Sequence, residues 1–231
     1  MGPFTRISRR VTAGFGLAFA VAVAAAIGTA WGRPGSDATG TQVDIFLIAH
    51  YHALQASLAL GAFALFLFAL FAGGVTTHLL RVDDATGDSW APGFAIGAAG
   101  FVSLWLSALA VQGAYQGLGH EGQLPPLIFE LFRVAQALGS AAGVLLGVLL
   151  VALGVSGMLN GTIPVPLAAL GLLDAVVAVI SGAGVATARG TFGTLQVVSL
   201  ILLAVFVALV SVWMIVSPAE ESRGGQLGTS G

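Results

Sequence analysis

The chain has 231 residues, of which 57% are hydrophobic and 8% charged, and its formal net charge is −2. A soluble domain carries about 25% charged residues, so a water-soluble globule is excluded, and the charge balance excludes a strongly basic nucleic-acid-binding surface. Because the chain has no cysteine, disulfides, Cys-liganded zinc, iron–sulfur clusters and thiol catalysis are excluded as well.

Long apolar stretches fill most of the chain. A helix of about 20 residues crosses the hydrocarbon core of a bilayer, and each stretch reaches that length. We therefore predict an all-α polytopic membrane protein of the cell membrane, a bundle of six transmembrane helices in one domain (1–217), followed by a disordered polar tail (218–231). The predicted spans are Val11–Trp31, His52–Gly74, Pro92–Tyr115, Leu127–Val155, Leu167–Thr187 and Phe192–Val216.

The first apolar stretch has two features of a signal peptide. Arg9 and Arg10 form a positive start, and the small residues Gly28 and Ala30 offer a cleavage site. The apolar segment is longer than the usual 7–15 residues of a signal peptide, however. We expect a retained helix.

The arginines between the spans indicate the orientation. With six spans both termini lie on one side, together with five arginines, whereas two lie on the other side. Since positive residues favour the cytoplasm, we predict cytoplasmic termini. The inner arginines are Arg6, Arg9, Arg10, Arg81 and Arg223, and the outer ones are Arg33 and Arg189.

The third span carries a helix-start signal. Asp88 and Ser89 are residue types that cap helices, and Pro92 suits a first turn. We expect one of these two side chains to cap the helix.

Polar side chains gather at the outer ends of the predicted spans. Each would be costly against lipid, so we predict that they converge on one outward-facing cavity. Arg133 is the expected anchor for an anionic group. Glu130, three residues earlier, forms with it either a structural ion pair or part of a ligand or proton site. The predicted pocket residues are His52, Gln55, Gln112, Gln116, Glu130, Arg133 and Gln136.

Small residues recur on one face of the fourth span, at Gly139, Gly143 and Gly147. Such a face lets another helix approach closely, and we predict contact with a helix of the same chain, of a second copy or of another complex subunit. The fifth span has a matching face around Asp174. That intramembrane acid either faces Arg133 or carries a proton, and both a proton relay and a helix–helix hydrogen bond remain open.

Four residues at the outer side form the candidate metal site. His50 and His52 point about 200° apart on a helix and share one ion only from a turn or extended segment; His120 and Glu121 would complete the site. Hydrolase, metalloprotease and phosphate-loop motifs are lacking. We assign no catalytic residue and no cofactor, and an enzyme is not favoured.

The turn Asn160-Gly161-Thr162-Ile163-Pro164, followed by a glycine-containing span from Leu167 to Leu172, carries a family resemblance. In this turn and in its six Ala/Gly/Leu-rich spans, the chain resembles a family of uncharacterised six-span integral membrane proteins of actinobacteria. It departs from that pattern after Pro164, where Val165 and Pro166 replace a tryptophan. The resemblance implies a six-span fold, but it implies no biochemical activity.

Three functions remain open. The first is a structural or accessory membrane component with an outward-facing polar pocket. The second is a transporter or permease for a small, anionic solute, and the third is a metal- or cofactor-binding membrane enzyme. The partners we expect are the lipid bilayer and further subunits, not nucleic acid.

Overall fold

A computed structural model describes residues 3–29, 32, 39–120, 125–183 and 190–217, except the side chains of 3–8, 44, 120, 125 and 190–193. These residues form a six-helix bundle, and each helix is long and apolar enough to cross a membrane. The predicted all-α, six-span fold is therefore confirmed. The tail predicted at 218–231 lies outside the described residues. The helices are α1 (Pro3–Thr29), α2 (Gly40–Thr86), α3 (Trp90–His120), α4 (Pro125–Asn160), α5 (Val165–Gly182) and α6 (Gly190–Val216).

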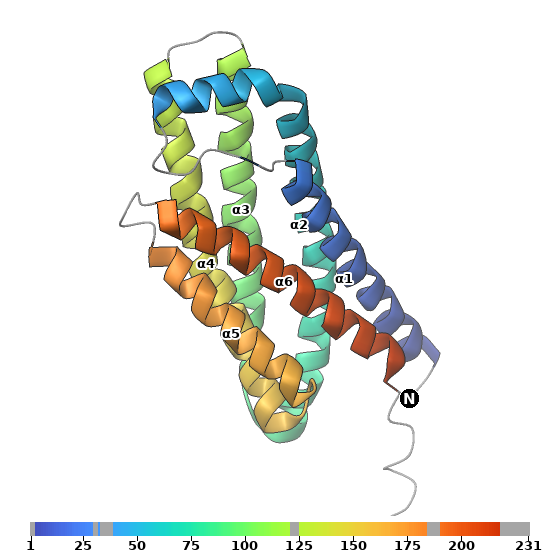
Figure 1. Cartoon of the computed structure of the whole chain (residues 1–231). Coiled ribbons are helices and arrows are strands. Elements are labelled where there is room, and N and C mark those ends of the chain that lie inside the picture. Colours follow the sequence, from blue (N-terminus) through green and yellow to red (C-terminus); the bar gives the residue numbers. More distant parts are fainter. Residues whose placement is uncertain (1–2, 30–31, 33–38, 121–124, 184–189, 218–231) are drawn as a thin grey trace, which may run out of the picture.

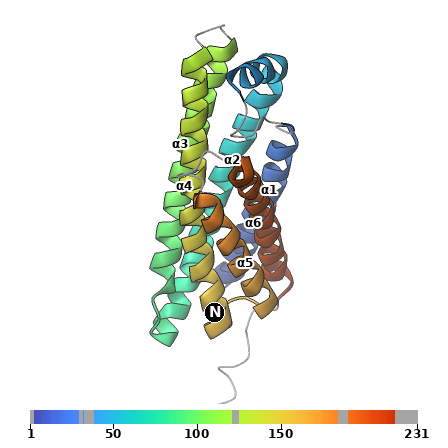
Figure 2. The ribbon, with the colours of Figure 1, turned by 60° about the vertical axis from the view of Figure 1, so that its left-hand side comes forward.

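The helices form two layers (Figures 1 and 2). The long helices α2, α3 and α4 run up and down beside one another, and α1, α5 and α6 cross one face of that layer obliquely. The start of α1 and the end of α6 lie at the same end of the bundle, as an even number of spans requires. The cytoplasmic location of that end stays a prediction.

Helix α2 begins earlier than the sequence predicted, at Gly40 rather than His52. Thr39 and Gln42 form a capping box, since each side chain bonds the backbone N–H of the other residue. The first turns then run across the ends of α3 and α4, and the chain bends at His50, whose φ of −119° and ψ of 19° are not helical. The kink turns the following residues into the direction of the bundle.

The start of α3 is stabilised by a residue that the sequence analysis did not select. The carboxylate Oδ2 of Asp83 accepts the backbone N–H of Ala91 at 2.7 Å. Asp88, a predicted cap, instead accepts a hydrogen bond from Asn160 Nδ2 at 2.7 Å and so ties the α2–α3 turn to the end of α4. The predicted cap was wrong because the turn after Gly87, at φ 80°, brings a residue of the preceding helix to the start of α3.

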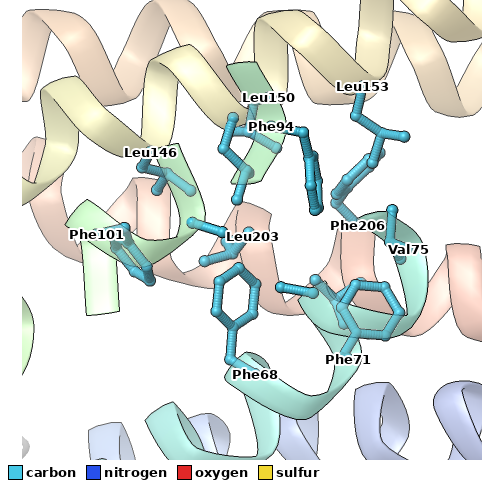
Figure 3. Packing of buried hydrophobic residues seen from close by; sticks show 14 of the residues in the cluster. Phe68, Phe71, Val75, Phe94, Phe101, Leu146, Leu150, Leu153, Leu203 and Phe206 are labelled. Carbon is cyan, nitrogen blue, oxygen red and sulfur yellow. The ribbon is translucent and has the colours of Figure 1, made fainter. Parts of the chain in front are cut away.

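One apolar cluster fills the interior, and all six helices contribute to it. Figure 3 shows its centre, where Phe68 and Phe71 of α2 face side chains of α3, α4 and α6. The Phe68 ring meets Phe101 edge-on, with centroids 5.4 Å apart. Burial of these rings stabilises the bundle through close packing, because lipid tails are as apolar as the side chains themselves.

Glycines bring the helix backbones together, as predicted for α4. A Cβ added to Gly143 would lie 2.7 Å from the carbonyl oxygen of Ala178 in α5, and one added to Gly147 would overlap Val179. The predicted close approach of a helix to this face is thus confirmed, and the helix is α5 of the same chain. Gly139 faces Gln196 of α6 instead. A further close approach, at Gly97, joins α3 to the α4 backbone, where an added Cβ would lie 2.6 Å from the Leu149 nitrogen.

Arg9 connects the two ends of the chain. Its guanidinium lies 5.2 Å from the centre of the Trp213 ring, and Nη1 donates to the Ser217 carbonyl at 3.4 Å. We expect Arg9→Ala to destabilise the bundle by about 1 kcal/mol, through loss of the cation–π contact and of a positive charge at the end of α6. The neighbouring Arg10 is exposed, so Arg10→Ala is the matched control. Thermal unfolding in detergent measures both; equal melting temperatures for the two variants would contradict this role.

The orientation is tested by single cysteines in this naturally cysteine-free chain. We expect an impermeant thiol reagent to label Thr39→Cys in intact cells and to spare Ser8→Cys until the membrane is opened. Labelling of position 8 alone in intact cells would show that the orientation is the reverse of the predicted one.

Candidate functional site

The long helices extend past the others at the end opposite the termini (Figures 1 and 2). Helix α3 has 31 residues and α4 has 36, whereas about 20 cross the hydrocarbon core. We call this extension the cap and define it as residues 40–58, 109–120 and 125–139. A second, smaller apolar cluster holds it together, formed by Val43, Leu47, Leu54, Tyr115, Ile128, Phe132 and Ala135. The excess helix length explains why polar residues are concentrated at one end of the sequence spans.

All seven predicted pocket residues lie in the cap, but in different surroundings. Gln112 and Gln116 are buried, with 8% and 0% of their surface exposed. Gln55 and Gln136 are half-buried, and His52, Glu130 and Arg133 are exposed. The buried and exposed members therefore form an inner and an outer group.

The outer group contains the ion pair that the sequence suggested. Arg133 Nη1 lies 3.7 Å from Glu130 Oε1, and the two side chains are 49% and 66% exposed. The guanidinium also lies 5.9 Å from the centre of the Phe129 ring. An exposed pair of this kind contributes little to stability and leaves both charges accessible at the surface of the cap.

The inner group contains an unusual side chain, Gln116. Neither Oε1 nor Nε2 of this fully buried amide has a hydrogen-bond partner within the described residues. Leaving a buried polar group unpaired costs about 1–3 kcal/mol. Gln116 is therefore the strongest indication in the cap of a position that a further polar group completes.

Two histidines of the candidate metal site, His50 and His52, lie at the kink of α2 and contact neighbouring residues of the same helix. His50 Nδ1 lies 3.1 Å from the Phe46 carbonyl, its ring stacks on Phe46 at 4.4 Å, and His52 meets Tyr51 edge-on at 5.5 Å. The described residues include no group of three His, Asp or Glu side chains close enough to hold a metal ion. The side chains of His120 and Glu121 lie outside the described part, so the four-residue site stays a prediction.

Asp174 lies between α5 and α6, fully buried. Its Oδ1 accepts a hydrogen bond from Ser199 Oγ at 2.7 Å, whereas Oδ2 has no partner among the described residues. Arg133, the other partner considered for Asp174, forms its ion pair with Glu130. Asp174 thus makes the helix–helix hydrogen bond considered from the sequence, to α6 rather than to α4. Ser199 was missed because a single serine in an apolar span has no periodic signal.

No protein-family model, curated protein or solved structure matches this chain. We therefore infer the function from the geometry of the cap, the core and the Asp174–Ser199 pair.

Proposed function

We propose that this multi-pass membrane protein is a structural or accessory component that holds a polar cap at the outer face of the cell membrane. The observation that supports the proposal is the single apolar cluster below the cap, to which all six helices contribute. Such a core anchors the cap, because its apolar side chains pack the six helices against one another. The exposed Glu130–Arg133 pair then serves as a contact for a membrane-complex subunit.

The experiment compares the size of the assembly in native membranes. The full chain, solubilised in mild detergent, is expected to migrate in a complex larger than its monomer. Glu130→Ala with Arg133→Ala should release the monomer without lowering its melting temperature, since both side chains are exposed. Thr41→Ala, at another exposed cap position, is the control. A monomer in native membranes for all three proteins would overturn the proposal.

Transport is the second candidate, and Asp174 is the observation that favours it. Asp174 is a buried intramembrane carboxyl, and its Oδ2 has no partner in the described part of the chain; such carboxyls occur in proton pathways. Purified protein in liposomes under a pH gradient would show proton uptake that Asp174→Asn abolishes. Equal dye quenching in protein-containing and empty liposomes would exclude this candidate.

The resemblance to actinobacterial six-span proteins remains part of the proposal. It adds a lineage and no biochemical role.

A further inference from the structure

The surroundings of Gln116 show where a ligand would meet its amide. On α3, Gln112, Gln116 and Gly119 follow one another at spacings of four and three residues, which places them within about 60° on one face of the helix. On one side of that face, Gly113 neighbours Leu58 of α2, 3.8 Å from its added Cβ. On the other side, Tyr115 meets Phe132 of α4 edge-on at 5.9 Å. The Gln116 side chain therefore points into the middle of the cap.

The first turns of α2 close the cap above Gln116. We call residues 40–49 the lid. Its buried side chains, Val43 and Leu47, belong to the apolar cluster of the cap. Leu47 packs on Gly119, about one helical turn beyond Gln116: a Cβ added to Gly119 would lie 3.6 Å from the Leu47 Cβ. Glycine at 119 thus allows the lid to lie against α3.

The lid is attached by a hinge rather than by a continuous helix. His50 interrupts the helical backbone, and its ring contacts Phe46 in the turn before the bend. The other face of the lid is exposed at Ile45 and Ile48. Among the described side chains of the lid, Val43 and Leu47 are buried in the cap cluster and Phe46 packs against it. Because this cluster is smaller than the main core, we expect opening of the lid to cost less than opening of the main core.

We propose that Gln116 lies in a binding site for a small uncharged molecule with an amide end and an apolar body, which enters when the lid opens at His50. An amide group pairs with Gln116 because it both donates to Oε1 and accepts from Nε2, the two atoms that have no partner among the described residues. The apolar body matches the side chains of the cap cluster, which carry no charge. The charged Glu130–Arg133 pair is exposed, so this site is separate from the proposed subunit contact and is tested independently of it.

The opening of the lid is tested by thiol labelling in the cysteine-free chain. N-ethylmaleimide is small and neutral, and we expect it to label Gln116→Cys in membranes although position 116 is fully buried. Butyramide, a primary amide with an apolar tail, should not slow that labelling, because Gln116→Cys lacks the amide with which butyramide pairs. Ala108→Cys, equally buried on the same face of α3 but two turns deeper, is the control and should stay unlabelled. Equal labelling at 108 and 116, or none at 116, would overturn the proposal.

A disulfide lock tests the lid directly in a chain that keeps Gln116. The Cβ separation of 3.6 Å at Leu47 and Gly119 lies within the range of disulfides, so Leu47→Cys with Gly119→Cys should cross-link on oxidation. Butyramide should raise the melting temperature of the reduced double variant and of the wild type. It should have no effect on the oxidised protein, into which it cannot enter, nor on Gln116→Met, which removes the amide. A shift that persists in Gln116→Met, or no shift in the wild type, would overturn the assignment of the ligand to Gln116.

Discussion

Gly143→Leu should disrupt the α4–α5 interface and destabilise the protein by about 3 kcal/mol or more. A Cβ at this position would already lie 2.7 Å from the Ala178 carbonyl oxygen and 2.9 Å from Ser181 Oγ. The further carbons of leucine would then have to occupy the space of the α5 backbone. Since a backbone does not rotate away as a flexible side chain does, the two helices must separate. Thermal unfolding in detergent measures the loss.

Gly73→Leu is the matched control for Gly143→Leu. Gly73 is also in the interior of a long helix, but a Cβ added there meets nothing within 4 Å. This substitution should leave the melting temperature unchanged or raise it, because leucine favours helix more than glycine does. Equal losses for the two variants would show that general helix effects, and not the close approach of α5, explain the result.

The second large effect is expected at the Asp174–Ser199 pair. Ser199→Ala removes the one hydrogen-bond donor that the described residues offer to the fully buried carboxyl of Asp174. The carboxyl would then have both oxygens unpaired in an apolar environment, at a cost of about 2 kcal/mol. Adding Asp174→Leu should recover most of that loss, because removal of both polar partners leaves no unpaired group.

The control for Ser199→Ala is a serine whose replacement should hardly change the stability of the protein. Ser107 is exposed and bonds only the Ser103 carbonyl of its own helix, at 2.9 Å. Ser107→Ala should change stability by less than about 0.5 kcal/mol. If the double variant Asp174→Leu with Ser199→Ala is less stable than Ser199→Ala alone, the pair is not an isolated hydrogen bond, and the carboxyl has a further partner.

The number of helices and the small-residue face of α4 were predictable from the sequence because both are local properties. A span requires only enough consecutive apolar residues, and spacings of three and four place Gly143 and Gly147 on one face whatever surrounds them. That α5 of the same chain is the partner of Gly143 was one of the alternatives that the sequence left open. The lengths of the helices were less predictable: α2 begins at Gly40 and α3 ends at His120, beyond their apolar spans, and residues of these extra turns pack in the cap.

The partners of the polar residues were decided by the tertiary structure. Asp174 bonds Ser199 and not Arg133 because α6 crosses the bundle obliquely; nothing in the sequence of either helix specifies that angle. Asp83 caps α3 because the Gly87 turn returns the chain to it. Gln116 is buried and Arg133 exposed although both are polar residues near helix ends. The sequence by itself determined which segments are helical and apolar. Packing between distant residues set the rotation, crossing and bending of those helices. That packing decided which polar groups of the described residues are paired, exposed or left without a partner.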